Sequence, residues 1–383
     1  MKKEKGPNIL VRLLGNKKWQ FISIPLFSIL CSLLAISIII LIIGKNPLAA
    51  FLSLLQGSGI VPKSTYSGGK GMLTDFLDLL DALTPMLFAA LAVAVAYKAG
   101  LFNIGVSGQM LIAGFMATVV VGYSGLSALV ARPLVILIGI AVGALAGGLI
   151  GFLKYKFNIN EVVASIMLNY IFQYVISYFI NTRYIDPVSR QSTAINPEAR
   201  LTLMNVELGS YNTRIPLCFL LAIAVALLLH FFIAKTKQGY ELKAVGLNSM
   251  GARYAGMRVG KNLLMAMTLS GALAGLAGVT YYLGYFNSIQ PGSLSSLGFD
   301  SIAVALLGNS HPIGIIFSSL LITVLSKGST YMSSSVGVRQ EVTSLVIGMI
   351  LLFSACGAFI RYRVDIEGRK GPAKPADKKG EKI

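Results

Sequence analysis

The chain has 383 residues, of which 55% are hydrophobic and only 13% are charged. A soluble domain usually carries about 25% charged residues, so this composition excludes an ordinary soluble enzyme and requires lipid around the chain. The formal net charge of +18 lies mostly between the apolar segments, a distribution that favours retention on the anionic inner leaflet of a membrane and not nucleic-acid binding.

Ten apolar segments have lengths that suit membrane-spanning helices. Most run about 15 to 25 residues, close to the ~20 that cross ~30 Å of hydrocarbon, whereas strands of a membrane barrel alternate over about 10 residues. The sequence therefore predicts an all-α integral membrane protein with about ten transmembrane helices, some of them short or discontinuous. In chain order the segments are 21–43, 82–97, 101–121, 134–153, 162–180, 215–234, 263–285, 299–308, 313–325 and 342–360.

The first apolar segment, 21–43, follows basic residues, as a signal peptide does. Its 23 residues exceed the about 7–15 of a signal core, so we interpret it as a retained anchor. Three basic stretches are predicted to be cytoplasmic by the positive-inside rule. The predicted organisation is a cytoplasmic N-terminus (1–20), a transmembrane domain (21–360) that includes a cytoplasmic loop (235–262), and a disordered cytoplasmic tail (361–383).

The connections between the early segments differ in character. Residues 44–72 are rich in Gly, Ser and Lys and show no hydrophobic periodicity. Asp75, Asp78 and Asp81 follow at every third position, and we interpret them as one wet face at a helix entry in preference to a cation site. The longest connection, 181–214, is predicted to be an external loop or a short interfacial helix.

Glycines recur four residues apart within two of the predicted spans. Such faces let helix backbones approach closely, so the helices are predicted to form a tight bundle. The glycines are Gly139, Gly143, Gly147 and Gly151 in one span, and Gly271 and Gly275 in another.

Two late segments, 299–308 and 313–325, are too short to cross a membrane alone. They flank Ser310, His311 and Pro312, a break that predicts two short crossing helices or a re-entrant hairpin. Counting both as crossings makes an even number of spans, which places the two termini on the same side. This agrees with the basic character of both tails.

The sequence contains no motif for nucleotide hydrolysis or other catalysis. G-x-x-x-x-G-K-[ST], H-E-x-x-H and G-x-S-x-G are all absent, and the two histidines, His230 and His311, are interpreted as residues of span ends. The three cysteines lie in apolar segments without metal-type spacing. We therefore predict no enzymatic activity, no metal and no cofactor.

Polar residues in or beside the apolar segments are costly in lipid and tend to face a cavity or another helix. The glycine-rich stretch 100–109 additionally permits a discontinuous helix. For each polar residue, hydrogen bonding between helices or helix capping competes with a place on a translocation path. The candidates for the path are Asn103, Gln109, Asn160, Glu161, Asn169, Asn287, Gln290 and Asp300.

The predicted cytoplasmic loop contains the most specific pattern. Residues 235–257 read KTKQGYELKAVGLNSMGARYAGM, a polar stretch studded with Ala, Leu and Tyr that is typical of a short amphipathic helix offered to a soluble partner. The pattern resembles the EAA-type coupling loop of permease subunits in bacterial ABC importers, with Glu241, Ala244 and Gly246 at matching places. The resemblance continues through Asn248, Ala252, Arg253, Tyr254, Ala255 and Gly256.

Two further stretches carry the same resemblance. Residues 100–109, GLFNIGVSGQ, are similar to a segment of permeases related to those for ribose, branched-chain amino acids and nucleosides. Residues 160–170, NEVVASIMLNY, resemble the nucleoside subgroup. The chain departs from the family pattern at Ser107, where Glu is frequent, and at Ser249 and Met250, where Pro-Glu is frequent.

The resemblance implies a type II-like ABC importer permease that translocates nucleosides across the cell membrane. It implies ten helices, a path between two permease subunits that are usually unlike, two ABC ATPase subunits that use the ATP, and an extracellular substrate-binding lipoprotein. Contact with the ATPase is expected from the coupling loop, where Gly246 allows close approach and charged side chains pair with the partner. The expected coupling residues are Glu241, Ala244, Gly246, Asn248 and Arg253.

Three alternatives stay open at this point. The same architecture serves permeases for ribose, other simple sugars or branched-chain amino acids. An ion-coupled secondary transporter would need a buried carboxylate in the middle of a span, whereas Glu161 and Asp300 lie near predicted helix ends. A membrane-embedded enzyme would need a paired catalytic group, which the sequence lacks.

Overall fold

The structure, a computed structural model, describes residues 20–66, 70–208 and 211–355. The predicted tail at 361–383 and residues 1–19 of the basic N-terminus lie outside these ranges. The helices are α2 (Gln20–Ile42), α3 (Pro47–Gly57), α4 (Met72–Lys98), α5 (Val106–Ala117), α6 (Ala128–Phe157), α7 (Glu161–Phe179), α8 (Cys218–Lys235), α9 (Lys237–Leu247), α10 (Ser249–Tyr254), α11 (Val259–Thr280), α12 (Leu297–Leu307), α13 (Pro312–Val336) and α14 (Gln340–Ala355). The remaining elements are η1 (Thr118–Gly122), η2 (Ile180–Tyr184), η3 (Pro197–Ala199), η4 (Tyr281–Tyr285), β1 (Thr202–Leu208) and β2 (Tyr211–Pro216).

The predicted apolar segments are helical, which confirms the fold class. Within the described residues six helices are long and apolar enough to cross a membrane: α4, α6, α7 with η2, α8, α11 with η4, and α13. The α2 and α3 helices together form a seventh candidate bent by 115°, and α5 with η1, α12 and α14 are shorter apolar helices. These elements cover the same stretches as the ten predicted segments, and ten crossings remains a prediction.

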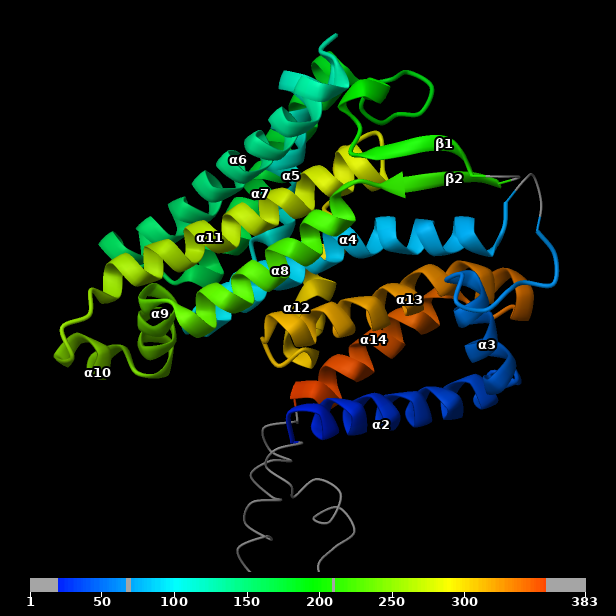
Figure 1. Cartoon of the computed structure of the whole chain (residues 1–383), viewed down its shortest axis with the longest axis horizontal. Helices are drawn as coiled ribbons and strands as arrows, with labels where there is room; N and C mark the ends of the chain where they lie inside the picture. Colours follow the sequence, from blue (N-terminus) through cyan, green and yellow to red (C-terminus); the bar gives the residue numbers. More distant parts are fainter. Residues whose placement is uncertain (1–19, 67–69, 209–210, 356–383) are drawn as a thin grey trace, which may run out of the picture.

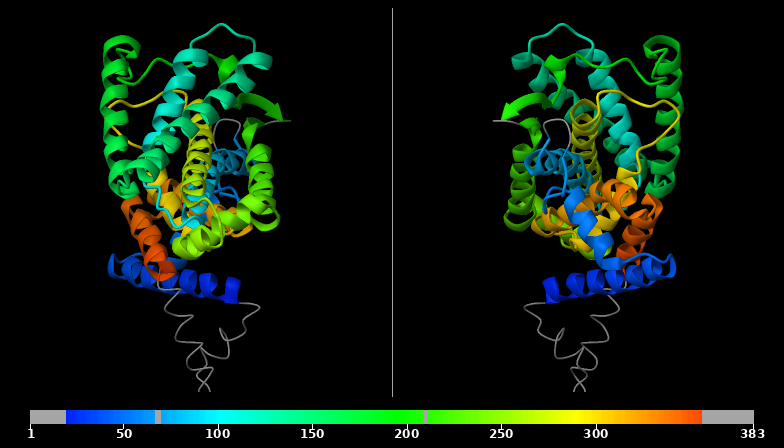
Figure 2. Two further views of the ribbon diagram at one scale, coloured as in Figure 1. Left: turned by 90° about the vertical axis from the view of Figure 1, so that its left-hand side faces the viewer. Right: turned by 90° about the vertical axis from the view of Figure 1, so that its right-hand side faces the viewer.

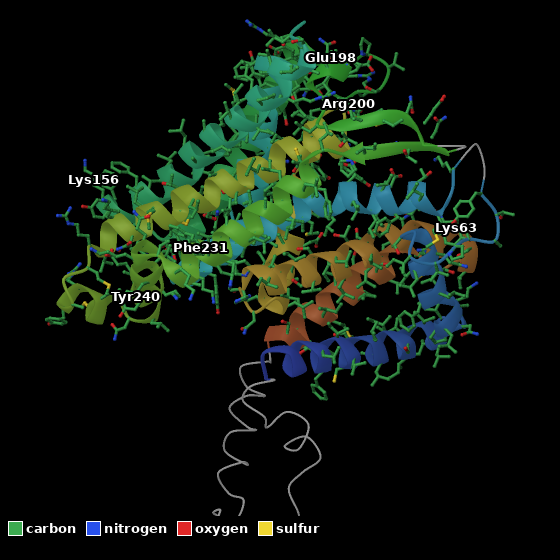
Figure 3. All side chains as sticks on the ribbon, in the orientation of Figure 1. Lys63, Lys156, Glu198, Arg200, Phe231 and Tyr240 are labelled. Atoms are coloured by element: carbon green, nitrogen blue, oxygen red, sulfur yellow. The ribbon has the colours of Figure 1, made fainter. Side chains whose placement is uncertain are left out.

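The bundle has two distinct ends (Figure 1). The α9 and α10 helices lie at one, here called the coupling end, and the β1–β2 hairpin lies at the other, the hairpin end. Labelled side chains mark the two ends: Tyr240 and Lys156 lie at the coupling end, and Lys63 and Arg200 at the hairpin end (Figure 3). The Ser28 hydroxyl donates to the Phe353 carbonyl, so α2 begins beside the described end of α14.

The core is built around α4, which is buried on every side from Leu83 to Ala96. Its second half is rich in alanine, and these small side chains let α8, α11, α12 and α13 pack closely around it. Phe88 is the largest fully buried side chain of the described chain. A central helix without a lipid-facing side is therefore the scaffold on which the shorter helices are arranged.

The predicted glycine faces pack against each other, as expected. The α6 glycines meet the α11 glycines backbone to backbone: a Cβ added to Gly143 would lie 2.7 Å from the Gly275 Cα, and one added to Gly147 would lie 2.7 Å from the Gly271 Cα. Contact this close leaves no room for any side chain in the seam. The tight bundle predicted from the glycine spacing is confirmed for this pair of helices.

The 181–214 connection differs from its prediction. It contains a short 3-10 turn, η3, and leads into an antiparallel hairpin in which Thr202 pairs with Pro216. The prediction of a loop or interfacial helix missed these strands because they are short and only one side is covered, by α4. The hairpin is held there by a hydrogen bond from the Thr202 hydroxyl to the Asp81 carboxylate, at 2.8 Å.

The three aspartates of α4 are anchors for the connections, and the prediction of one wet face was wrong for Asp81. Asp75 pairs with Lys63 at 2.6 Å, and Asp78 lies 3.8 Å from Arg214 of β2. Asp81 is 3% exposed, because the hairpin covers it. Each carboxylate therefore fixes a different connecting residue to the first half of α4.

Two other expectations need correction. The 44–72 stretch contains α3, which begins after Asn46, whose side chain accepts from the Leu48 amide at 2.9 Å. The 313–325 segment continues as a helix to Val336, so it is long enough to cross alone. Its polar second half stays helical because it packs on protein: a Cβ on Gly328 of α13 would lie 2.7 Å from the Leu54 Cα of α3.

The glycine seam yields a direct test. Gly147→Ala is expected to destabilise the folded protein by about 1–3 kcal/mol, because the new methyl group has no space against Gly271 and the two backbones must separate. Thermal unfolding of the purified protein in detergent measures the change. Gly148→Ala is the matched control, since a Cβ there meets only the Thr268 side chain, at 3.1 Å. Equal stability of the two variants would contradict the packing described.

Candidate functional site

The chain between α4 and α5 is broken, and buried amides hold the break together. Gly100 has a φ of +74°, a left-handed conformation, and the chain stays irregular until α5 begins. The Asn103 side-chain oxygen accepts from the Gly105 backbone amide at 3.0 Å, and the Asn103 side-chain nitrogen donates to the Gln109 side chain at 3.0 Å and to the Ser270 hydroxyl at 2.8 Å. Ser270 in turn donates to the Ala92 carbonyl at 2.6 Å. This network ties the break to α4 and α11.

Asn169 ties the same break to α7. Its side-chain oxygen accepts from the Gly108 amide and its nitrogen donates to the Ile104 carbonyl, both at 3.0 Å. Asn103, Gln109 and Asn169 are all at most 3% exposed. The structure brings these three predicted path residues together. Asn103 and Asn169 satisfy backbone groups that the broken helix leaves without partners, and Gln109 is bonded to the Asn103 side chain.

Asn160 and Glu161 lie apart from that network, at the coupling end. The Asn160 side chain caps α7 by accepting from the Val162 amide at 2.9 Å. Glu161 pairs with Lys154 of α6 at 3.0 Å. Helix capping and an ion pair are thus the observed contacts of these two predicted path residues.

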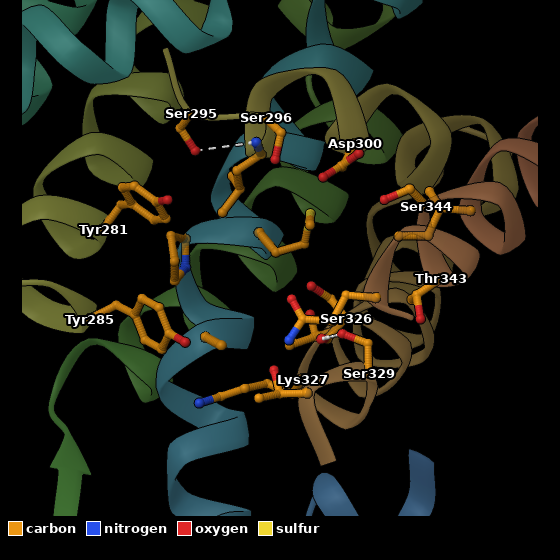
Figure 4. Close-up of a pocket in the computed structure, with 18 of the residues that line it drawn as sticks. Tyr281, Tyr285, Ser295, Ser296, Asp300, Ser326, Lys327, Ser329, Thr343 and Ser344 are labelled. Carbon is orange, nitrogen blue, oxygen red and sulfur yellow. Dashed lines mark hydrogen bonds between the residues drawn. The ribbon is translucent and has the colours of Figure 1, made fainter. Parts of the chain in front are cut away.

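A cavity of about 440 Å³ lies between α4, η4, α12, α13 and α14 (Figure 4). Tyr281 and Tyr285 line one side, with ring centroids 6.3 Å apart and planes tilted by 27°. Lys327 of α13 lies 5.0 Å from the Tyr285 ring centroid, within the range of a cation–π contact. Asp300 of α12 is on the opposite wall. The other polar residues that line the cavity carry hydroxyls, apart from one amide, and are Ser295, Ser296, Thr323, Ser326, Ser329, Thr330, Gln340, Thr343 and Ser344.

This lining suits the binding of a small molecule. The volume falls within the ~300–1,000 Å³ of small-molecule pockets, with aromatic faces for a flat ring and hydroxyls for a polar rim. Among the described residues, no group of three His, Cys, Asp or Glu side chains is placed to hold a metal ion. Of the predicted path residues, Asp300 lines this cavity. Asn287 and Gln290 are exposed on the adjoining loop 286–296, which connects η4 to α12.

Sequence reasoning missed most of the cavity lining. Lys327 was overlooked because the predicted span ended at residue 325, although a cation inside a 25-residue apolar helix is a recognisable signal. Tyr281 and Tyr285 lie near the end of a predicted span, a place where the sequence is compatible with an interfacial aromatic belt as well as with a stacking surface. The hydroxyls of α13 and α14 carry no signal in a single sequence, because serine and threonine occur freely in buried membrane helices.

The coupling end consists of α9 and α10, each with its own N-cap. Thr236 accepts from the Gly239 amide at 3.0 Å, and Asn248 accepts from the Gly251 amide at 2.9 Å. Glu241 of α9 accepts from the Asn262 amide of α11 at 3.1 Å, so this expected coupling charge contacts its own bundle. The two helices are therefore docked to the membrane helices and do not hang free.

Gly246 makes the closest of these contacts. A Cβ added there would lie 2.9 Å from the Ala99 carbonyl carbon and 2.9 Å from the Gly100 nitrogen. The glycine thus faces the end of α4 and the start of the broken segment. Ala244 is partly buried, and Asn248 and Arg253 are exposed.

Three apolar side chains at this end point into solvent. Leu247, Met250 and Tyr254 are 87%, 65% and 94% exposed. The family resemblance includes Tyr254 and gives Met250 as a departure from the pattern, but it assigns a contact with the partner to none of the three. We call these three residues the coupling patch.

Residues 76–355 match the family model described as "Branched-chain amino acid transport system / permease component". The chain belongs to this permease family. The match covers all of the cavity-lining helices and the coupling end, so the sites described above lie inside the family domain.

Three relatives resemble this permease over nearly its whole length. The guanosine ABC transporter permease protein NupP of Bacillus subtilis is 35% identical, covering 93% of this chain and 99% of the relative. The nucleoside ABC transporter permease protein NupB of Lactococcus lactis is 32% identical, covering 96% and 100%. The glucose ABC transporter permease protein TsgB13 of Haloferax volcanii is 28% identical, covering 94% and 95%.

Proposed function

We propose that this permease carries nucleosides across the cell membrane as one subunit of an ATP-driven ABC importer. The observation that carries the proposal is its end-to-end similarity to permeases named for guanosine and for nucleosides. The three relatives described are all ABC permeases, so they give no support to an ion-coupled secondary transporter. The chain itself is the conduit and contains no hydrolytic motif.

The cavity supports a nucleoside as cargo. A nucleobase would stack on Tyr281 or Tyr285, a contact worth about 1–3 kcal/mol per base. The sugar hydroxyls would meet Asp300 and the hydroxyl groups of α13 and α14. Glucose is the second candidate, because one full-length relative is named for it. A sugar uses the polar wall but gains less from two tyrosine faces.

The coupling end supports docking of a separate ATPase. Leu247, Met250 and Tyr254 expose apolar surface at an end where the neighbouring side chains are basic, and isolated apolar patches of this kind mark protein–protein contacts. A hollow of about 490 Å³ beside the patch, lined by Lys98, Glu161, Lys243 and Leu247, leaves room for a partner's side chain. The proposal puts the coupling end in the cytoplasm, and with it the basic loop 235–262.

The rest of the assembly follows from the same proposal. A second permease, which we expect to be an unlike chain, completes the path, and a substrate-binding lipoprotein delivers the nucleoside at the hairpin end. The hairpin is held to α4 by the Asp78–Arg214 pair and by the Thr202 hydrogen bond to Asp81. A binding protein that docks on it would therefore press on the central helix.

The coupling patch can be tested against a matched leucine. Leu247→Ala and Tyr254→Ala are each expected to weaken association with the ATPase by about 1–2 kcal/mol, the range of an interface residue near the centre of a contact. Co-purification of the ATPase with the tagged permease measures the change. Leu129→Ala is the control. Leu129 is as exposed as Leu247, at 87%, but it lies in the first turn of α6, away from the coupling end. ATPase recovery that is unchanged in both patch variants would remove the assignment.

The cargo is tested by uptake. Cells that lack the native transporter and express this permease with its partner subunits are expected to accumulate labelled guanosine, with other nucleosides competing and glucose not competing. Tyr285→Ala should lower this uptake by roughly 5- to 100-fold, because it removes a stacking face, and Tyr285→Phe should keep it. Competition by glucose together with indifference to nucleosides would overturn the nucleoside proposal in favour of the sugar.

A further inference from the structure

Two apolar grooves run along the outer side of α11. The first lies between α8 and α11 and has a volume of about 660 Å³, and the second lies between α6 and α11 and has a volume of about 630 Å³. Figure 1 shows α11 between these two helices, and both views in Figure 2 show α8 at the edge of the bundle away from α7. Leu228 of the first groove and Leu145 of the second are 67% and 74% exposed. Both grooves therefore open on the outside of the bundle.

The grooves are separate from the sites described above and are almost wholly apolar. They share no lining residue with the tyrosine-lined cavity or with the hollow beside the coupling patch. Leu264 and Thr268 of α11 line both grooves, so the grooves lie on either side of this pair. The Thr268 hydroxyl donates to the Leu264 carbonyl at 2.9 Å and needs no other partner. Apart from Thr268, the polar lining residues are Gln238 and Lys261.

Each groove has the depth of one membrane leaflet. On α11 the first groove extends from Leu264 to Leu273, a rise of about 14 Å at ~1.5 Å per residue. On α6 the second extends from Ala141 to Phe152, a rise of about 17 Å. Half of a ~30 Å hydrocarbon core is about 15 Å. Both grooves start near the coupling end, so each has the length of an acyl chain from the leaflet on that side.

A cation lies where each groove reaches the coupling end. Lys261, in the first turn of α11, lines the first groove. The Lys156 ammonium lies 5.5 Å from the ring centroid of Phe152, which lines the second groove. Tyr155 packs against Gly260, so the last turn of α6 meets the first turn of α11. The ends of the two grooves, each with its lysine, are therefore neighbours.

The charge of these two lysines is complementary to an anionic headgroup. Glu161 and Glu241 at this end each pair with another lysine, at 3.0 and 3.9 Å. Among the described residues, neither Lys156 nor Lys261 has an ion-pair partner. Basic pockets between membrane helices bind anionic lipid headgroups in this way. A free phosphate would leave the grooves empty, and a zwitterionic lipid would bring a second cation to the lysines.

We propose that α6, α8 and α11 form a binding site for one anionic phospholipid, with its phosphate held by Lys156 and Lys261 and one acyl chain in each groove. Gln238 of α9 also lines the first groove, so the bound lipid contacts the coupling end as well as the membrane helices. The lipid belongs to the leaflet on the coupling side. That leaflet is cytoplasmic under the proposed function, which is all that the site takes from it.

The headgroup contact is tested by native mass spectrometry of the assembled transporter, with dioleoyl phosphatidylglycerol added in detergent. Dioleoyl phosphatidylcholine, which has the same chains, is expected to bind more weakly. Lys156→Gln and Lys261→Gln should each weaken phosphatidylglycerol binding roughly fivefold, and together about 30-fold, as for lysines near an anionic surface. Lys243→Gln is the control, because it removes an equal charge at the same end but lines neither groove. Equal binding of the two lipids, or equal loss in the control and the double variant, would overturn the headgroup contact.

The acyl-chain contact is tested by filling one groove. Ala272→Trp places a ring in the first groove and is expected to weaken phosphatidylglycerol binding at least about tenfold, the loss caused by about two methylene groups that no longer find a place. Ala224→Trp is the control, because Ala224 is exposed on α8 and lines neither groove. The same spectra report whether each variant is assembled. Unchanged binding in assembled Ala272→Trp would overturn the site.

Two further outcomes would also contradict the lipid. Displacement of the phosphatidylglycerol by excess inorganic phosphate would indicate an anion site without acyl chains. Retention of neither phospholipid by the assembled transporter would indicate that another subunit covers the grooves. None of these outcomes bears on the cargo, which the uptake of guanosine and glucose tests separately.

Discussion

The contact between Gly246 and the end of α4 is the interaction on which the rest of the structure depends. It is backbone against backbone, with the Ala99 carbonyl carbon and the Gly100 nitrogen each 2.9 Å from the place where a Cβ would lie on Gly246. Gly100 is itself in the left-handed region, at a φ of +74°. Because no flexible side chain lies between the two segments, a displacement of α9 reaches the broken segment directly.

From that turn the displacement has a defined route into the bundle. Asn103 is three residues beyond Gly100 and is bonded to α5 through Gln109 and to α11 through Ser270. Asn169 links the same segment to α7, whose exposed face carries Tyr170 and Tyr174. Under the proposed function, the close α6–α11 glycine seam favours movement of these two helices as one rigid body. In the proposed transport cycle, the polar residues of the break would transmit this motion as well as satisfy the backbone.

Fully buried polar networks also explain why the break is tolerated at all. A broken helix leaves backbone groups unpaired, and in lipid each costs several kcal/mol. Asn103 and Asn169 satisfy the Gly105 and Gly108 amides and the Ile104 carbonyl without water. The α4–α5 junction is therefore irregular, yet its backbone groups are satisfied by hydrogen bonds. Such a segment suits the transmission of a displacement from α9, because it can move without losing its structure.

Much of this architecture could be predicted from single-sequence physics, and the limits have physical causes. Apolar runs and four-residue glycine spacing predicted the helices and the α6–α11 seam, because lipid forces both features into the local sequence. The same reasoning missed α3, which is apolar but only 11 residues long within a stretch rich in Gly, Ser and Lys. It also missed the β1–β2 hairpin and the second half of α13, which are polar stretches that owe their form to tertiary contact. It identified Gly246 but expected it to face the ATPase, whereas Leu247 and Tyr254 are the residues that point outward.

The most direct measurement of the central claim is the number of nucleosides imported per ATP hydrolysed by the reconstituted transporter carrying Gly246→Ala. A methyl group at 246 would force α9 away from Ala99 and Gly100, so the account predicts that the ATPase still binds and hydrolyses ATP while import per ATP falls. Gly251→Ala, where the nearest atom would be at an ordinary 3.4 Å, should behave as the unmodified chain. An assembled Gly246→Ala transporter with an unchanged ratio of import to hydrolysis would contradict the account.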